Sequence, residues 1–195
     1  MIGHAHMGGF GSIEGVAAAK AEIIAGLRPE GIAILNADDA RAAAMAELAP
    51  ARVLTFSARG RQADLRAENV DLDAAARAAF DLHLPGLTEP RRVQLAVAGV
   101  HNVSNALAAA GLALAAGIAS ELVADRLGSV SIESPHRMDI SELSGDLLLI
   151  DDSYNANIDS MTAALAVLPA LAGDRRRVVV ISEMLELGES SAADH

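Results

Sequence analysis

A polar stretch near residue 150 combines side chains that could do chemistry. Its sequence is Asp151-Asp152-Ser153-Tyr154-Asn155-Ala156-Asn157, and an apolar run at 147–150 leads into it. Two adjacent carboxylates suggest a metal site or an acid–base site, and the amides and the phenol add hydrogen-bonding groups. A plain turn is the alternative, because Asp159 or Ser160 could cap the helix that follows. Polarity alone does not separate the two interpretations, since loops serve both purposes.

A second candidate is the only lysine of the chain, Lys20. Lys and Arg together number 15, so all the remaining residues of this group are Arg. A lysine side chain can lose its proton and act as a nucleophilic amine, whereas a guanidinium stays charged. The ordinary alternative is a lysine on a helix surface whose stem covers apolar neighbours. The residue types alone leave both interpretations open.

Two asparagines form a third candidate at the start of an Ala- and Leu-rich stretch that favours a helix. Asn102 and Asn105 are three residues apart, so both side chains can face the same way. A side-chain amide donates and accepts hydrogen bonds, which suits the edge of an adenine ring. As an alternative, Asn102 could be the N-cap of the helix, but that role leaves Asn105 unexplained.

Composition restricts the class of protein. The 195 residues suit one large or two small domains, and 52% hydrophobic residues are enough for a core. A net charge of −11 argues against a nucleic-acid partner. The absence of cysteine excludes disulfides and thiolate metal sites and is compatible with a reducing cytosol. The apolar runs are too short for a transmembrane helix, and the N-terminus has no signal-peptide pattern.

The expected elements alternate between strands and helices, which predicts an α/β fold. Alternating apolar residues at 80–84 and 93–97 predict an antiparallel pair. The segments 146–150, 160–171 and 177–182 predict a strand–helix–strand unit in a parallel sheet. We place a domain boundary near residue 134, and expect the second domain to continue beyond residue 195. Further helices are expected at 12–27, 40–48, 102–117 and 120–127, and further strands at 32–35 and 52–56.

The motifs taken together resemble those of the Mur ligases of peptidoglycan synthesis. They are 151–157, Met184-Leu185-Glu186-Leu187-Gly188, His101–Leu107, and Ala5–Ser12 with Ala19–Ile23. The resemblance implies an ATP-dependent enzyme of three domains that forms an amide bond through an acyl phosphate. Residues 1–133 are expected to be the second part of its central ATPase domain, a mixed sheet with helices. Residues 134–195 are expected to begin its Rossmann-like C-terminal domain.

The resemblance also implies partners. It is strongest to the members that join D-Ala-D-Ala to UDP-MurNAc-tripeptide, with ATP and Mg²⁺ as cofactors, as monomers in the cytoplasm. The family's P-loop is expected upstream, because the chain contains no Gly-Lys-Thr. We therefore expect the chain alone to be inactive. Two alternatives are a non-catalytic fragment that binds adenine nucleotides and an α/β domain without an intact site.

Finally, the resemblance implies roles for individual residues. Lys20 would be carbamylated, because a carbamate supplies the oxygen donors that Mg²⁺ prefers, and His6 would lie close to the metal. Forming the carbamate requires a neutral amine. Arg137 could instead be a surface residue of a linker, and the polar side chain after 32–35 could serve only a turn. The nucleotide-binding residues implied are Asn102 and Asn105 for adenine, Asp152 for ribose, Arg137, Tyr154 and Asn155 near ribose or phosphate, and Asn36.

Overall fold

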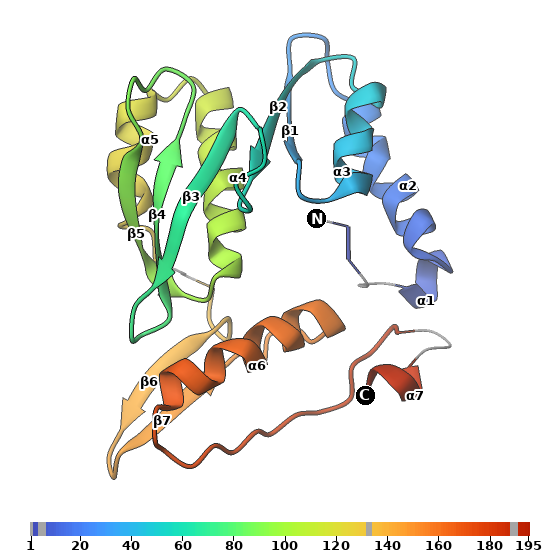
Figure 1. Ribbon diagram of the computed structural model, residues 1–195. Coiled ribbons are helices and arrows are strands. Elements are labelled where there is room, and N and C mark those ends of the chain that lie inside the picture. The colour runs from blue at the N-terminus through green and yellow to red at the C-terminus, as the bar shows by residue number, and fades with distance from the viewer. Residues whose placement is uncertain (1, 4–6, 132–133, 188–190) are drawn as a thin grey trace.

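The computed structural model describes residues 2–3, 7–131, 134–187 and 191–195, and it shows an α/β protein of two parts (Figure 1). The first part contains a five-stranded sheet, and the second contains a hairpin and one long helix. The helices are α1 (Met7–Phe10), α2 (Ile13–Ala25), α3 (Ala40–Ala44), the 3-10 helix η1 (Met45–Leu48), α4 (His101–Ala115), α5 (Ser120–Leu127), α6 (Ile158–Ala172) and α7 (Ser191–Asp194). The strands are β1 (Ile32–Asn36), β2 (Arg52–Ser57), β3 (Leu65–Leu72), β4 (Arg77–His83), β5 (Arg91–Ala98), β6 (Asp139–Leu143) and β7 (Leu147–Asp151).

The large sheet is mixed, with the strands in the order β1-β2-β3-β4-β5. β1, β2 and β3 pair in parallel, and β3, β4 and β5 pair antiparallel. The antiparallel pair expected from alternating apolar residues is confirmed, with Phe80 opposite Val93. Successive side chains of a strand point to opposite faces, so Phe80 and Leu82, which are two residues apart, lie on the same face. Both are fully buried. They belong to the main core, which the buried side of α4 completes with Val103 and Leu107.

Helix α4 lies very close to the sheet through a glycine. A Cβ atom at Gly111 would lie 2.7 Å from Cγ2 of Ile34 on β1. Real Cβ atoms do not approach this closely, so the helix and the strand can touch only because residue 111 has no side chain. This contact sets the distance of α4 from the sheet, and the first turn of α4 carries the polar side chains considered below.

The C-terminal part departs from the expected strand–helix–strand unit. β6 and β7 form an antiparallel hairpin, with Asp139 opposite Asp151. Helix α6 follows and ends before Gly173, but 177–182 is not a strand, and Val180 is 93% exposed. Isolated strands are unstable without a neighbour to share their backbone hydrogen bonds. Among the described residues no such neighbour pairs with 177–182, so its β-branched side chains alone do not make it a strand.

Two strands and two helix caps were not foreseen. β3 and β6 are rich in charged and polar residues, and all of β6 is exposed, so neither carries a clear apolar pattern. The N-cap of α6 is Asn157, not Asp159 or Ser160 as expected. Asn157 forms a capping box with Ser160. The N-cap of α4 is Val100, not Asn102. No helix in the described part of the chain combines the length and the apolarity that a membrane span needs.

Candidate functional site

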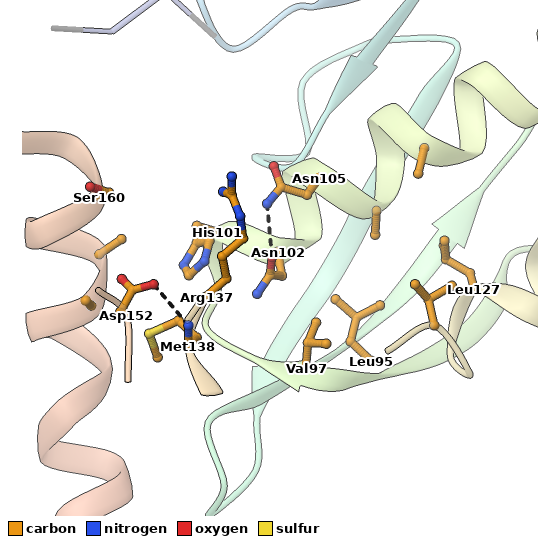
Figure 2. A pocket seen from close by; sticks show the side chains of 15 residues that line it. Leu95, Val97, His101, Asn102, Asn105, Leu127, Arg137, Met138, Asp152 and Ser160 are labelled. Carbon is orange, nitrogen blue, oxygen red and sulfur yellow. Dashed lines mark hydrogen bonds between the residues drawn. The ribbon is translucent and has the colours of Figure 1, made fainter. Parts of the chain in front are cut away.

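A cavity of about 480 Å³ lies between the two parts of the chain (Figure 2). One wall comes from β5 and the start of α4, and the other comes from residues 137–138, Asp152 and α6. A small apolar cluster of Val167, Ala76 and Ala98 joins the two parts. Four residues that the sequence nominated line this cavity together: Asn102, Asn105, Arg137 and Asp152.

The two asparagines of α4 have different environments. Asn102 is only 8% exposed, and its Nδ2 donates a hydrogen bond of 2.8 Å to the carbonyl oxygen of Ala98. Its Oδ1 accepts a hydrogen bond of 3.0 Å from Nδ2 of Asn105. Asn105 is exposed, so its own side-chain oxygen remains available on the cavity side. Asn102 therefore holds the first turn of α4 in place, and Asn105 is the better placed of the two to contact a ligand.

The adjacent carboxylates Asp151 and Asp152 hold a tight turn across the cavity. Oδ1 of Asp152 accepts a 3.0 Å hydrogen bond from the backbone N–H of Met138. Oδ2 of Asp151 lies 2.7 Å from Nδ1 of His136. His136 and Met138 both have left-handed backbone angles, with φ of 61° and 50°. Such angles are uncommon without glycine, so the two carboxylates stabilise an unusual backbone around Arg137.

Hydrogen bonding stabilises the charged form of Asp151. The hydroxyl of Ser153 first, and then His136, stabilise its carboxylate and lower its pKa from 3.8 to about 2. Asp151 does not line the cavity, whereas Asp152 does. The metal or acid–base site suggested by two adjacent carboxylates is thus not what these contacts form. One carboxylate serves the turn, and the other serves the turn and also faces the cavity.

Arg137 is positioned by an aromatic ring. Its guanidinium carbon lies 4.0 Å from the centre of the Tyr154 ring, a cation–π contact. The backbone N–H of Tyr154 also donates to the carbonyl oxygen of His136 at 3.0 Å. Tyr154 itself is 62% exposed and does not line the cavity. Its contact therefore orients Arg137, whose side chain reaches the cavity.

Two other nominated residues lie outside the cavity. Asn155 is exposed, and its Oδ1 accepts a hydrogen bond from the N–H of Ala156. Asn36 is 7% exposed at the end of β1, where its Oδ1 accepts a 2.8 Å hydrogen bond from the N–H of Asp38. Asn36 thus performs the turn role that the sequence left open for it.

The nominated metal-site residues are not brought to this cavity either. Lys20 is exposed on α2, and His6 lies outside the described residues. Among the residues that the structure describes, no three His, Cys, Asp or Glu side chains surround a possible metal position. The proposed pairing of Lys20 with His6 therefore stays a prediction.

The sequence did not indicate a binding role for one cavity residue, His101. His101 is the first residue of α4 and lines the cavity with Asn105, Arg137 and Asp152. Burial lowers the pKa of His101, and the negative charge of Asp152 partly opposes this effect. Its position directly before Asn102, in the His101–Leu107 motif, was the feature of the sequence that could have indicated it. A lone histidine at the start of a helix, however, has no obvious role.

Together, the mixed sheet, the polar first turn of α4 and the second part across the cavity define an α/β protein with a cavity between its two parts. The Mur ligase middle domain matches residues 1–113, and the Mur ligase glutamate ligase domain matches residues 136–195. The chain therefore belongs to the Mur ligase family. The resemblance noted in the sequence and the α/β fold class expected from it are both confirmed.

The relatives it matches are longer than this chain. The UDP-N-acetylmuramoyl-tripeptide–D-alanyl-D-alanine ligase of Mycobacterium tuberculosis (strain ATCC 25618 / H37Rv) is 43% identical over 198 residues, which cover 100% of this chain and 38% of the relative. The ligase of the same name from Escherichia coli (strain K12) is 41% identical over 193 residues, covering 98% and 41%. Crystal structure I of MurF from Acinetobacter baumannii superposes with a TM-score of 0.87 at 36% identity, covering 99% of this chain and 41% of that one. The chain thus spans less than half the length of each.

Proposed function

We propose that this chain is part of an ATP-dependent ligase that adds D-Ala-D-Ala to UDP-MurNAc-tripeptide, and that its cavity binds an adenine nucleotide. The names of the relatives support the reaction. The observation that carries the nucleotide site is the convergence of Asn105, Arg137 and Asp152 on one cavity from two parts of the chain. We further propose that residues 1–133 belong to the central domain and 134–195 to the C-terminal domain of a monomeric cytoplasmic enzyme.

The chemistry of the cavity suits such a nucleotide. Its volume of about 480 Å³ is within the range of small-molecule sites. The amide of Asn105 can donate to and accept from an adenine edge. The carboxylate of Asp152 accepts hydrogen bonds, as ribose hydroxyls require, and the Arg137 guanidinium matches phosphate oxygens. Tyr154 would contribute by orienting Arg137, and Asn155 by its place in the same loop.

Mur ligases use ATP with Mg²⁺ in general. We propose that Lys20, as a carbamate, and His6 hold this metal in the intact enzyme. Lys20 is exposed on α2, and a carbamate on its side chain would offer the oxygen donors that Mg²⁺ prefers. When bound, Mg²⁺ would offset the negative charge on the phosphates. In the reaction, the substrate carboxylate would take the γ-phosphoryl group of ATP, and the amine of D-Ala-D-Ala would then displace phosphate.

Calorimetry with AMP and with ATP tests the nucleotide site on the chain itself. Both ligands are expected to bind, and Asp152→Asn is expected to weaken binding by about tenfold, the effect of one hydrogen bond to a charged group. Asp174→Asn is the matched control, because Asp174 is exposed and makes no hydrogen bond or ion pair to other described residues. Binding of neither nucleotide by the unmodified chain would refute the proposal.

A non-catalytic role for the chain alone is favoured by one observation, the lack of a Gly-Lys-Thr sequence to hold the β- and γ-phosphates. We expect the 195-residue chain to bind AMP but to release no phosphate from ATP in response to D-Ala-D-Ala. Release of phosphate that depends on D-Ala-D-Ala would show that the chain alone is an active ligase.

A further inference from the structure

The imidazole of His101 lines the cavity, and none of the described residues forms a hydrogen bond with it. It lies at the start of α4, and Figure 2 shows its ring on the Asp152 side of Asn102. Within the described residues, neither ring nitrogen makes a hydrogen bond. By contrast, both ends of the neighbouring Asn102 amide are paired inside the protein. His101 is thus a polar side chain of the cavity whose hydrogen-bonding groups remain available to a ligand.

A glycine keeps the ring in this place. Gly99 has a φ of +103°, and a Cβ atom there would lie 2.5 Å from Cε1 and 2.8 Å from Nδ1 of His101. The ring therefore packs directly against the backbone of residue 99. The backbone angle and the close contact both require glycine at this position. The imidazole is held by packing, which leaves its nitrogens unused.

Burial favours a neutral imidazole at His101. Of the other described residues that line the cavity, Arg137 and Asp152 are ionisable, one positive and one negative. Burial lowers the pKa of His101, and Asp152 opposes this effect only in part. A neutral imidazole has one N–H donor and one acceptor nitrogen. This pair matches a hydroxyl group, which also donates and accepts, whereas a phosphate is better matched by the cationic donors of Arg137.

We propose that His101 is a ribose-binding residue that acts with Asp152 from the opposite wall of the cavity. The proposal rests on the proposed function, because it requires an adenine nucleotide in the cavity. A sugar whose hydroxyls donate to the Asp152 carboxylate would lie within reach of the His101 ring, since the two residues line the same space. Each wall would then hold the sugar, so binding would bring the two domains together.

The test compares AMP with 2′-deoxy-AMP and 3′-deoxy-AMP by calorimetry. The unmodified chain is expected to bind at least one deoxy nucleotide roughly three- to tenfold more weakly than AMP, the effect of one hydrogen bond. His101→Leu should weaken AMP and reduce this discrimination to what Asp152 alone provides, whereas His101→Gln, which keeps a donor and an acceptor, should reduce it less. Asn105→Ala is the matched control, because it should weaken AMP and both deoxy forms by the same factor.

A measurement without substitutions covers the case in which His101→Leu does not fold. Nitrogen NMR of the imidazole in the unmodified chain should show a change of the His101 ring signals with adenosine, and a much smaller change with 2′,3′-dideoxyadenosine. Equal changes with the two nucleosides, or equal weakening of all nucleotides by His101→Leu, would overturn the role of His101. Failure of the unmodified chain to bind AMP would instead overturn the proposed function.

Discussion

The side-chain amide of Asn105 donates a 3.0 Å hydrogen bond to the side-chain oxygen of Asn102. Asn102 is itself fixed to the sheet, because its own Nδ2 donates to the carbonyl oxygen of Ala98 at the end of β5. This chain of hydrogen bonds connects the sheet to the exposed amide that lines the cavity. The two asparagines therefore have separate tasks, one in holding the helix start and one in facing the cavity.

The two tasks predict different results for the two alanine substitutions. Asn102→Ala should lower the free energy of unfolding by about 1–3 kcal/mol, because the buried carbonyl of Ala98 loses its side-chain donor. Asn105→Ala should change it by about 0.5 kcal/mol or less, as for an ordinary surface position, while weakening AMP severalfold. Urea unfolding and calorimetry on the same samples measure both. Equal loss of stability in the two variants would contradict this division.

The glycines at the two ends of α4 allow the contact with His101 to be isolated. Gly99 and Gly117 both have left-handed backbones, with φ of +103° and +85°, but nothing lies within 4 Å of a Cβ atom at Gly117. Gly117→Ala should therefore cost about 1–2 kcal/mol of stability for the backbone alone. Gly99→Ala should cost more and should also weaken AMP, because the new methyl group displaces the His101 ring. Unchanged AMP affinity in Gly99→Ala would show that the ring position does not matter for binding.

The sequence foretold α4 and its polar start better than it foretold the details of the site. The Ala- and Leu-rich composition predicted the helix, and the family resemblance indicated both Asn102 and Asn105 as candidate adenine-binding residues. What the sequence did not contain was the direction of each amide, because residues three apart share a helix face whether they bind a ligand or each other. That distinction arises from burial against β5, a contact that depends on the tertiary fold.

The same limit explains the C-terminal part. The apolar run at 178–181 has the composition of a buried strand, yet Val178, Val179 and Ile181 are exposed beside Val180. A strand requires a neighbour with which to pair, and composition does not report where that neighbour is. β6 shows the opposite case, because its exposed residues have little strand pattern but its pairing with β7 makes it a strand.

The lowered pKa of Asp151 predicts that the stability of the folded chain decreases at acidic pH. Its pKa in the folded chain is about 2, below the ordinary 3.8, chiefly because the Ser153 hydroxyl and then His136 bond to the carboxylate. A folded-state pKa below the unfolded one adds stability above about pH 4, and this stability is lost as the pH falls toward 2. Thermal unfolding between pH 5 and 2 should show a smaller acid loss for Asp151→Asn than for the unmodified chain. Asp174→Asn should behave like the unmodified chain, and a carboxyl NMR titration of Asp151 centred near 3.8 would contradict the assignment.

The close contact of Gly111 with Ile34 predicts a substitution whose effect changes sign. In an open helix, Gly→Ala stabilises by about 1 kcal/mol, because alanine has the higher helix propensity. At Gly111 the new methyl group would lie 2.7 Å from Cγ2 of Ile34, and overpacking of this kind costs about 1–3 kcal/mol. Gly111→Ala should therefore destabilise the unmodified chain. In the Ile34→Ala background the obstructing atom is absent, so the same substitution should stabilise. A double-mutant cycle by urea unfolding measures the coupling, and additive effects would show that the helix moves away from the strand without loss.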